Sequence, residues 1–283
     1  MKKILLTGST GFIGSTLVKV LSKKYLIYII LRKKNRKFSK NKNIIKIKYN
    51  NLKNLNNKLR KLKINTVVHC ATHYVKNHNF EDIKKLSDSN ILFGNIILEN
   101  LKKMGVKKFI NFSTVWENYD GKKGNYFNLY SAYKASFVNI INYYKKKLNN
   151  IKFINLAISD TFGQNDKRKK IINVLRDNYK KNYETKVVSK NLYMNLLNVA
   201  DIKNAIYLIL EKNYQSGEYL LENNKSYKIF DIVKNINNNN SKKIKVKWLS
   251  NKVLKEKSYK FKVLKDWKPA NSKIGDIVRT ITE

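Results

Sequence analysis

The chain has 283 residues, 42% hydrophobic and 28% charged, which suffices to bury a core in one large domain or in a domain with a smaller lobe. Its single cysteine, Cys70, excludes a scaffold built on disulfides within the chain and indicates a reducing compartment. The longest apolar run covers only residues 25–31, and the first residues lack the apolar stretch of a signal peptide. We therefore expect a soluble, cytoplasmic protein without a membrane span.

The net charge of +41 raises the question of a nucleic-acid partner. The basic residues are 54 lysines and only six arginines, whereas recognition of phosphates and bases favours the bidentate arginine fork. Residues with AT-rich codons are abundant and those with GC-rich codons scarce, as a mutational bias over a solvated surface would produce. The composition thus favours a solvated basic surface over a nucleic-acid face. The surface should still attract anionic small molecules such as nucleotides.

Short apolar runs alternate with amphipathic stretches over the first 160 residues, a pattern typical of an α/β fold with a parallel sheet. Six strands are predicted, at residues 4–6, 28–31, 44–47, 66–69, 109–112 and 153–156. Between the first two strands, one apolar stripe recurs at helical spacing: Ile13, Leu17, Val20 and Leu21. Further helices are predicted from about Asp82 to Met104, stopping at Gly105, and from near Tyr130.

The chain becomes more polar after Asp160, with shorter apolar runs. We predict a dinucleotide-binding domain over residues 1–165 with a return segment near 190–205. Residues 166–283 are predicted to form mainly a smaller α/β substrate lobe. The asparagine-rich stretch Asn237 to Asn240 is predicted to be a loop.

A glycine-rich turn follows the first predicted strand and opens the first predicted helix. In such a turn the first glycine permits a tight bend, the second lets the backbone approach a pyrophosphate, and the third lets the helix pack closely on the strand. Three of only ten glycines fall in this window, which predicts a dinucleotide site in a Rossmann-type doubly wound parallel sheet. Cofactor contacts are predicted for Thr7, Gly8, Thr10, Gly11, Phe12, Ile13 and Gly14.

The choice of cofactor should depend on the end of the second strand, where NAD-specific sites place a carboxylate against the ribose hydroxyls. Here the chain has Arg32, followed by Lys33 and Lys34. An arginine there would accept a 2′-phosphate, which favours NADP(H), with NAD(H) possible. The alternative is that Arg32 is one more cation on a basic surface.

A tyrosine and a lysine at i and i+4 share one helical face, where the ammonium can lower the phenol pKa and make the tyrosine a general acid or base. In a chain so rich in both residues, the spacing alone carries little information. Four such pairs occur: Tyr49/Lys53, Tyr119/Lys123, Tyr130/Lys134 and Tyr143/Lys147. Their position in the fold has to distinguish them.

One pair lies in Tyr130-Ser131-Ala132-Tyr133-Lys134, after a strand ending in Asn111-Phe112-Ser113-Thr114-Val115-Trp116. With the glycine turn, this arrangement resembles the extended short-chain dehydrogenase/reductase family of nucleotide-sugar epimerases, dehydratases and reductases. Similar motifs cover most of the chain: His69-Cys70-Ala71, Asn90, Asp160-Thr161-Phe162-Gly163, Asn198-Val199-Ala200-Asp201-Ile202 and Trp267-Lys268-Pro269. Within that family, the chain most resembles synthases of CDP-linked dideoxysugars.

The resemblance implies hydride transfer between a sugar carbon and nicotinamide. Tyr130 would exchange the proton, while Lys134 would bind the nicotinamide ribose and lower the pKa of Tyr130. A serine or threonine hydroxyl would orient the substrate oxygen, but Phe112 stands where many relatives carry it. Either Ser113 or Thr114 must then supply the hydroxyl, or the triad is incomplete.

The same resemblance suggests further contacts. Asn51 and Leu52 would lie against the adenine, and Cys70 and Ala71 would also border the cofactor. Substrate contacts are implied for Asn90, Thr114, Asp160 and Arg168, the last toward a diphosphate. No Cys/His cluster has metal-ligand spacing, so we predict no metal.

The favoured function is reduction of a 4-keto group on a nucleotide-activated sugar, because Arg32 suggests NADPH, which a reductase consumes stoichiometrically. An NAD-retaining 4-epimerase and a non-catalytic NADP(H)-binding relative are the alternatives. The chain lacks the adjacent Asp-Glu pair that 4,6-dehydratases of the family use, which makes dehydration the least favoured chemistry. A homodimer is common in the family and is expected as a possibility here.

Overall fold

A computed structural model describes residues 1–32, Phe38 and residues 41–283 of the chain, so Lys33 and Lys34 lie outside the described residues. The chain divides into two compact units. Unit 1 comprises Met1–Ala157, Glu211–Leu220 and Tyr259–Lys262, and unit 2 comprises Ile158–Leu210, Leu221–Ser258 and Val263–Glu283. The sequence placed the boundary at residue 165 and a return segment near 190–205. In the structure the first segment of unit 1 ends at Ala157, and the chain returns to this unit at Glu211–Leu220 and at Tyr259–Lys262.

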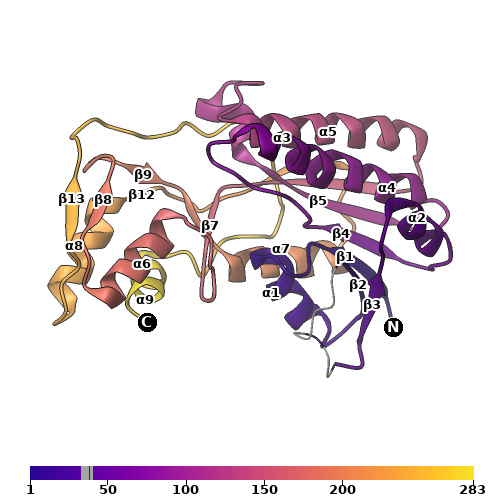
Figure 1. Ribbon diagram of the computed structural model, residues 1–283, viewed down its shortest axis with the longest axis horizontal. Helices are drawn as coiled ribbons and strands as arrows, with labels where there is room; N and C mark the ends of the chain where they lie inside the picture. Colours follow the sequence, from indigo (N-terminus) through magenta and orange to yellow (C-terminus); the bar gives the residue numbers. More distant parts are fainter. Residues whose placement is uncertain (33–37, 39–40) are drawn as a thin grey trace. The chain divides into compact units, whose positions relative to one another are not determined.

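An eight-stranded sheet carries the first unit (Figure 1). In spatial order its strands are β14 (Lys262–Val263), β11 (Gly217–Leu221), β6 (Lys152–Ile158), β5 (Lys108–Thr114), β4 (Thr66–His69), β1 (Lys3–Thr7), β2 (Leu26–Leu31) and β3 (Ile44–Lys48). Each neighbouring pair from β3 to β5 is parallel. All six predicted strands are confirmed, whereas β11 and β14 were not predicted.

The strand order reverses at β1, which lies between β2 and β4. At such a reversal the connections leave toward opposite faces of the sheet, and a crevice forms outside the carboxyl ends of the strands. Thr7 ends β1 in register with His69, which ends β4. The residues after these two strands, the glycine turn and the Cys70–Ala71 segment, therefore meet at this edge.

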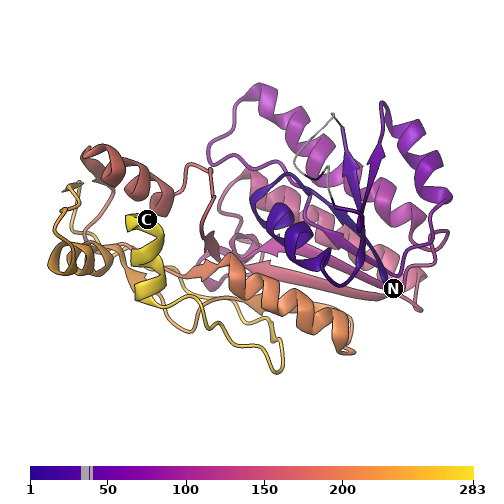
Figure 2. The same cartoon turned by 90° about the horizontal axis from the view of Figure 1, so that it is seen from below.

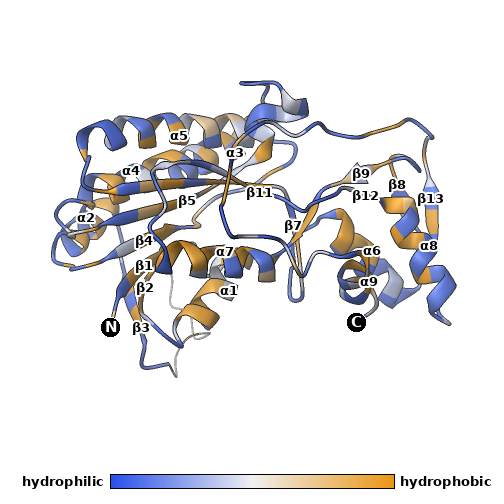
Figure 3. Ribbon diagram, turned by 180° about the vertical axis from the view of Figure 1, so that it is seen from behind, coloured by the Kyte–Doolittle hydropathy of each residue, from blue (hydrophilic) through white to orange (hydrophobic). Residues whose placement is uncertain are grey.

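Helices cover both faces of the sheet in unit 1, so the Rossmann-type prediction is confirmed. Figure 1 shows α2 (Leu52–Arg60), α4 (Phe93–Asn100) and α5 (Leu129–Lys147) on one face and α1 (Phe12–Leu21) on the other. The apolar sides of α2, α4 and α5 form a core with residues of the strands, and Phe109 of β5 and Phe137 of α5 are fully buried in it. Figure 3 shows apolar residues along β1 and α1.

The helix predicted as one element over 82–104 is interrupted in the structure. It consists of α3 (Phe80–Ser87), a π turn over Asp88–Leu92, and α4. A π turn inserts a residue into the helical repeat and is frequent at functional sites. The predicted end at Met104 and Gly105 is too late, since α4 ends at Asn100. Turns continue to Gly105, whose φ of +73° is the left-handed conformation common after helices.

Unit 2 has a core of its own between α6 (Ile171–Lys181), α8 (Ile229–Asn239) and α9 (Ile274–Thr282). Figure 2 shows α9, in yellow, beside α6. Short strands pair in twos: β7 (Asp160–Phe162) with β10 (Leu196–Asn198), β8 (Thr185–Val187) with β13 (Val246–Trp248), and β9 (Tyr193–Met194) with β12 (Tyr227–Lys228). The loop prediction for Asn237 to Asn240 is wrong up to Asn239, which ends α8.

A buried carboxylate organises the end of this unit. Asp201, in α7 (Val199–Glu211), is fully buried. It accepts hydrogen bonds from the backbone of Ala270 and Asn271 and from the side chains of Asn271 and Ser272, at 2.6–3.0 Å. The indole of Trp267 donates to the Asp201 carbonyl at 3.0 Å. The segment before α9 is thus fixed to α7. No helix in the described part of the chain is both long and apolar enough to cross a membrane.

Candidate active site

The glycine turn after β1 has a backbone that side chains would disrupt. Gly8 has φ +68°, and a Cβ there would lie 2.6 Å from backbone atoms of Cys70 and Ala71. A Cβ on Gly14 would lie 2.1 Å from the Gly8 carbonyl oxygen. The first and third glycines therefore permit close approach of β4 and of α1, respectively.

The second glycine leaves room for a ligand. Gly11 is the N-cap of α1, and a Cβ there would meet only the Gly8 carbonyl, at 3.3 Å, so no other described atom fills this position. Ser9, between the glycines, is 1% exposed, and its Oγ has no hydrogen-bond partner among the described residues. An open backbone at a helix N-terminus, beside an unsatisfied hydroxyl, fits the pyrophosphate of a dinucleotide. Of the other predicted contacts, Thr10 is exposed, while Phe12 and Ile13 are half-buried in the first turn of α1.

Thr7 holds the turn against β4. It is fully buried, and its Oγ1 lies 3.0 Å from Nδ1 of His69 and accepts from the backbone N–H of Ala71 at 3.1 Å. His69 is surrounded by the rings of Phe93, Phe109 and Phe137. Burial and, to a smaller extent, the charge of Lys134 lower the pKa of His69 to about 3. A neutral ring can accept the Thr7 hydroxyl proton at Nδ1.

The residues predicted to contact the adenosine half lie at the ends of β2 and β3. Arg32 is exposed directly after β2, close enough to Tyr49 for its charge to act on the phenol. Asn51 is the exposed N-cap of α2, and its Oδ1 accepts from the backbone N–H of Asn54 at 2.8 Å. Leu52, the first residue of α2, is 37% exposed. The structure thus places Arg32, Asn51 and Leu52 after neighbouring strands.

The predicted acid–base pair lies at the start of α5. Asn128 caps this helix and forms a capping box with Ser131, so α5 begins just before Tyr130. Tyr130 is half-buried, and Tyr74, from the loop after β4, meets it edge to face with ring centroids 5.0 Å apart. Lys134, one turn further on, is only 3% exposed. Tyr130 therefore retains access to solvent while its partner lysine is enclosed.

Lys134 is a buried charge near the ends of β4 and β5. Burial lowers the pKa of its ammonium, and the nearby groups Glu117 and Cys70 act in the opposite direction. Burial also raises the pKa of the Cys70 thiol. A Cβ on Gly8 would meet backbone atoms of Cys70 and Ala71, so these two residues adjoin the glycine turn.

The two candidate hydroxyls at the end of β5 have different surroundings. Side chains alternate along a strand, so Ser113 projects to the same face as Phe109, which packs beneath α5. Ser113 is 2% exposed, and its Oγ has no partner among the described residues. Thr114 projects to the other face, and its Oγ1 accepts from the backbone N–H of Trp116 at 3.3 Å. Phe112, like Thr114, points away from α5.

Asn90, in the π turn, is 1% exposed and binds the loop after β4. Its Oδ1 accepts from the Thr72 hydroxyl and the His73 backbone, both at 2.8 Å, and its Nδ2 donates to the His73 carbonyl at 3.0 Å. Asn90 therefore positions the loop that carries Tyr74.

Asp160 and Arg168 belong to unit 2, whereas the other predicted site residues belong to unit 1. Arg168 forms a two-pronged ion pair with the buried carboxylate of Asp166, at 2.7 and 2.8 Å, and also donates to Thr161. Asp160 forms an ion pair with Lys170. Both predicted substrate residues thus have charged partners within their own unit.

Three residues near the site were missed by the sequence interpretation: Ser9, Tyr74 and Glu117. Glu117 is 4% exposed, and burial, opposed by the charge of Lys134, raises its pKa to about 8. The sequence contained a signal for Glu117, because Thr114-Val115-Trp116-Glu117 has the spacing of a capping box. The structure forms this capping box. Tyr74 and Ser9 carry no comparable pattern.

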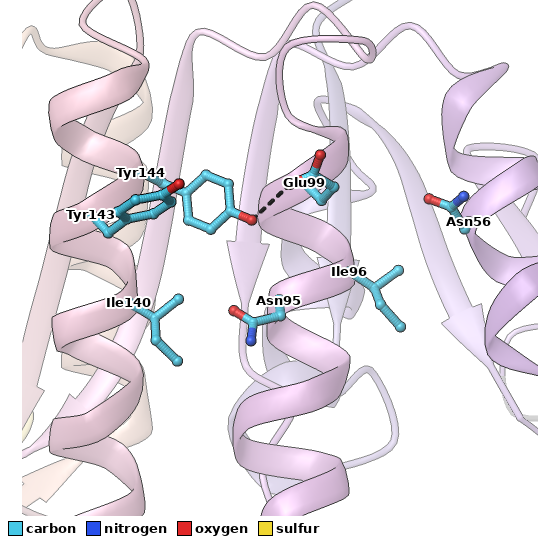
Figure 4. A pocket seen from close by; sticks show the side chains of 7 residues that line it. All are labelled: Asn56, Asn95, Ile96, Glu99, Ile140, Tyr143 and Tyr144. Atoms are coloured by element: carbon cyan, nitrogen blue, oxygen red, sulfur yellow. Dashed lines mark hydrogen bonds between the residues drawn. The ribbon is translucent and has the colours of Figure 1, made fainter.

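A pocket of about 430 Å³ lies elsewhere in unit 1, among α2, α4 and α5 (Figure 4). Across it the Tyr144 hydroxyl donates to Glu99 at 2.8 Å, and burial followed by this carboxylate raises the pKa of Tyr144 to about 12. None of its seven lining residues is a predicted site residue. Within the described ranges, no group of three or more His, Cys, Asp or Glu side chains is arranged to hold a metal ion.

The chain is similar to known proteins over most of its length. The model of the NAD dependent epimerase/dehydratase family matches residues 4–246. CDP-abequose synthase from Yersinia pseudotuberculosis is 31% identical over 221 residues, 77% of this chain and 75% of the relative. The enzyme of the same name from Salmonella muenchen is 27% identical over 247 residues, 85% and 83% of the two chains. UDP-glucose 4-epimerase from Thermus thermophilus, solved with NAD, has the same fold, with a TM-score of 0.80, 18% identity and coverage of 99% and 97%.

Proposed function

Because the chain is an enzyme that belongs to the NAD-dependent epimerase/dehydratase family, we propose that it reduces a keto group, at C4, on a nucleotide-activated sugar. The observation that carries this proposal is the enclosure of Lys134 beside the accessible Tyr130, in the unit that holds the glycine turn. The curated relatives are named CDP-abequose synthases, which supports a CDP-linked sugar as substrate.

A nicotinamide dinucleotide bound at the glycine turn would supply the hydride. Tyr130 would donate its phenolic proton to the substrate oxygen as the hydride arrives at the carbon. The ammonium of Lys134, one helical turn away, stabilises the phenolate left behind, because an opposite charge nearby favours the ionised form. Enclosure strengthens this effect, since a charge acts over a longer range where water is excluded.

Ser113 is the better candidate for the hydroxyl that orients the substrate oxygen. It lies on the α5 face of the sheet and has an unsatisfied Oγ, whereas the Thr114 hydroxyl is engaged with the Trp116 backbone. Thr7 and Asn90 would act indirectly: Thr7 holds the glycine turn in place, and Asn90 holds the loop after β4. Arg168, paired with Asp166, would meet a substrate diphosphate with only part of its charge available.

Arg32 supports NADP(H) as the cofactor, because an exposed guanidinium after β2 can pair with a 2′-phosphate. A 4-epimerase that retains NAD is the second candidate, and it is favoured by structural neighbours that include 4-epimerases solved with NAD. A homodimer remains a prediction that light scattering can test.

The deciding experiment compares two tyrosines of the same helix. Tyr130→Phe should lower kcat for NADPH-dependent reduction of a CDP-linked 4-keto sugar by about 10²–10⁴-fold, with NADPH affinity unchanged. Tyr143, in the exposed pair Tyr143/Lys147, is the matched control, and Tyr143→Phe should leave kcat unchanged. Full turnover by Tyr130→Phe would contradict the proposal. If the enzyme interconverts a 4-hydroxy sugar and consumes no NADPH, this result would favour the epimerase.

A further inference from the structure

Tyr74 is an aromatic residue that lies against the proposed proton donor, Tyr130. It belongs to the loop between β4 and α3, and both side chains are half-buried. The two rings meet edge to face, with their centroids 5.0 Å apart and their planes at 88°. This is one of the preferred arrangements of aromatic pairs, and it constrains the direction in which each ring points. The contact therefore bears on the position of the Tyr130 hydroxyl.

The loop that carries Tyr74 has no regular secondary structure, yet side chains fix it on both sides of this residue. Before Tyr74, the buried side chain of Asn90 binds the Thr72 hydroxyl at 2.8 Å and both backbone groups of His73 at 2.8 and 3.0 Å. These three hydrogen bonds join the loop to the π turn between α3 and α4. The backbone directly before Tyr74 is thus held in place.

Beyond Tyr74, the loop is bound to the helix that carries Tyr130. Asn128 is the N-cap of α5, and its Oδ1 accepts from the backbone N–H of Ser131 at 3.0 Å. The Nδ2 of the same side chain donates to the Lys76 carbonyl at 3.3 Å. One asparagine therefore connects the loop, two residues past Tyr74, with the first turn of α5.

Trp116 is a second aromatic neighbour of Tyr74. Its ring centroid lies 6.3 Å from that of Tyr74 and 4.9 Å from that of Phe127. The Trp116 carbonyl also accepts from the backbone N–H of Phe127 at 3.2 Å, and Phe127 directly precedes Asn128. Three segments of unit 1, those after β4, after β5 and at the start of α5, are consequently joined around the Tyr74 ring.

We infer that Tyr74 is a positioning residue that fixes the orientation of the Tyr130 ring, acting through this ring and touching neither substrate nor cofactor. The inference rests on the proposed role of Tyr130 as the proton donor. A general acid must lie within about 2.6–3.2 Å of the atom that it protonates, and a misplacement of ~1 Å can cost much of the rate. Because the hydroxyl lies at the far end of the ring, a small rotation of the Tyr130 side chain displaces it by a comparable distance.

The test removes the Tyr74 ring, and a control removes a similar ring contact elsewhere on α5. Tyr74→Leu should lower kcat by about two- to tenfold, as the loss of an aromatic pair predicts, with the sugar KM and the NADPH affinity unchanged. Tyr74→Phe keeps the ring and should retain most of kcat. Tyr143 meets Tyr144 edge to face with centroids 5.3 Å apart, and Tyr143→Leu should leave kcat unchanged.

NMR of tyrosine-labelled protein reports on the Tyr130 ring itself, whose signal is the one missing from Tyr130→Phe. The loss of the adjacent ring should shift this signal in Tyr74→Leu and leave it in place in Tyr143→Leu. An unshifted signal or an undiminished kcat in folded Tyr74→Leu overturns the inference, and so does an equal loss of kcat in Tyr74→Phe, which would assign the effect to the hydroxyl.

Should Tyr74→Leu fail to fold, Tyr74→Met, which fills a similar volume without a ring, takes its place and is judged by the same outcomes. In the wild type, the absence of nuclear Overhauser effects between the rings of Tyr74 and Tyr130 overturns the inference by itself. Normal turnover by Tyr130→Phe would overturn the proposed function instead, whatever the variants of Tyr74 do.

Discussion

The Thr7 hydroxyl lies 3.0 Å from Nδ1 of His69, and this contact joins the ends of β1 and β4 beneath the glycine turn. The tautomer of His69 decides which of the two groups donates, because a hydroxyl can donate to Nδ1 or accept from an Nδ1–H. The aromatic rings around His69 exclude water and oppose its protonation, so a neutral imidazole joins the two strand ends.

We predict that the free energy of unfolding decreases as the pH falls below about 6.5, partly because of His69. The unfolded chain binds a proton near that pH, whereas the folded protein resists it down to about 3. At 1.36 kcal/mol per unit, this difference amounts to at most roughly 5 kcal/mol. Chemical denaturation at a series of pH values should show a flatter dependence in His69→Gln, and no change of slope in the exposed control His78→Gln. Equal slopes for wild type and His69→Gln would contradict the prediction.

Gly14→Ala should disrupt the glycine turn. The new methyl group would meet the Gly8 carbonyl at 2.1 Å, a backbone atom that cannot rotate away. We expect a loss of about 1–3 kcal/mol in stability and a loss of NADPH binding, measured by denaturation and fluorescence titration. Gly275, in α9, is the control, because a methyl group there meets nothing within 4 Å. Gly275→Ala should be neutral or stabilising by up to about 1 kcal/mol. Unimpaired NADPH binding by Gly14→Ala would count against the site.

Arg32→Ala should weaken NADPH binding by roughly tenfold or more, which corresponds to the ~1.5 kcal/mol of a charge-assisted hydrogen bond. NADH binding should change little. Arg60→Ala, at the exposed end of α2, removes the same charge elsewhere and should affect neither cofactor. Titrations at physiological and at high salt separate a specific contact from general attraction by the basic surface. Equal effects of the two variants would remove the support for NADP(H).

Asp201→Ala should destabilise unit 2 by about 3 kcal/mol, since the donors at Ala270 and Asn271 and the buried hydroxyl of Ser272 would lose their acceptor. Asp177 has 60% of its side chain exposed and pairs only with its neighbour Arg176 among the contacts described. Asp177→Ala should change stability by less than about 0.5 kcal/mol. Hydrogen exchange would show faster opening of the segment before α9 in Asp201→Ala alone.

Local patterns predicted much of the fold and part of the site. The six strands have apolar runs bounded by polar residues, and the glycine spacing identified the turn because each glycine there meets a steric requirement. Only its place after a strand distinguished the Tyr130/Lys134 pair from the three other Tyr/Lys pairs with the same spacing. The choice stays a prediction; the structure buries Lys134, whereas Tyr143 and Lys147 are exposed on the same helix.

Features that depend on distant packing were not predictable in this way. Strand β14 has two residues, too few for a periodic signal. Asparagine has a low helix propensity, yet Asn237–Asn239 extend α8 because Ile232, Val233 and Ile236 bury its other face. The carboxylate partner of Arg168 and the burial of Glu117 also became visible only in three dimensions.

The position of the loop after β4 depends on the number of residues in the π turn at Asp88–Leu92. Removing one residue from this segment would restore the ordinary helical repeat and rotate α3 relative to α4 by about 100°. Asn90 would then turn away from Thr72 and His73, even though every residue type that binds the loop had been kept. A deletion in this turn would therefore change the helical phase between α3 and α4, and it should harm the site more than many substitutions in the same turn.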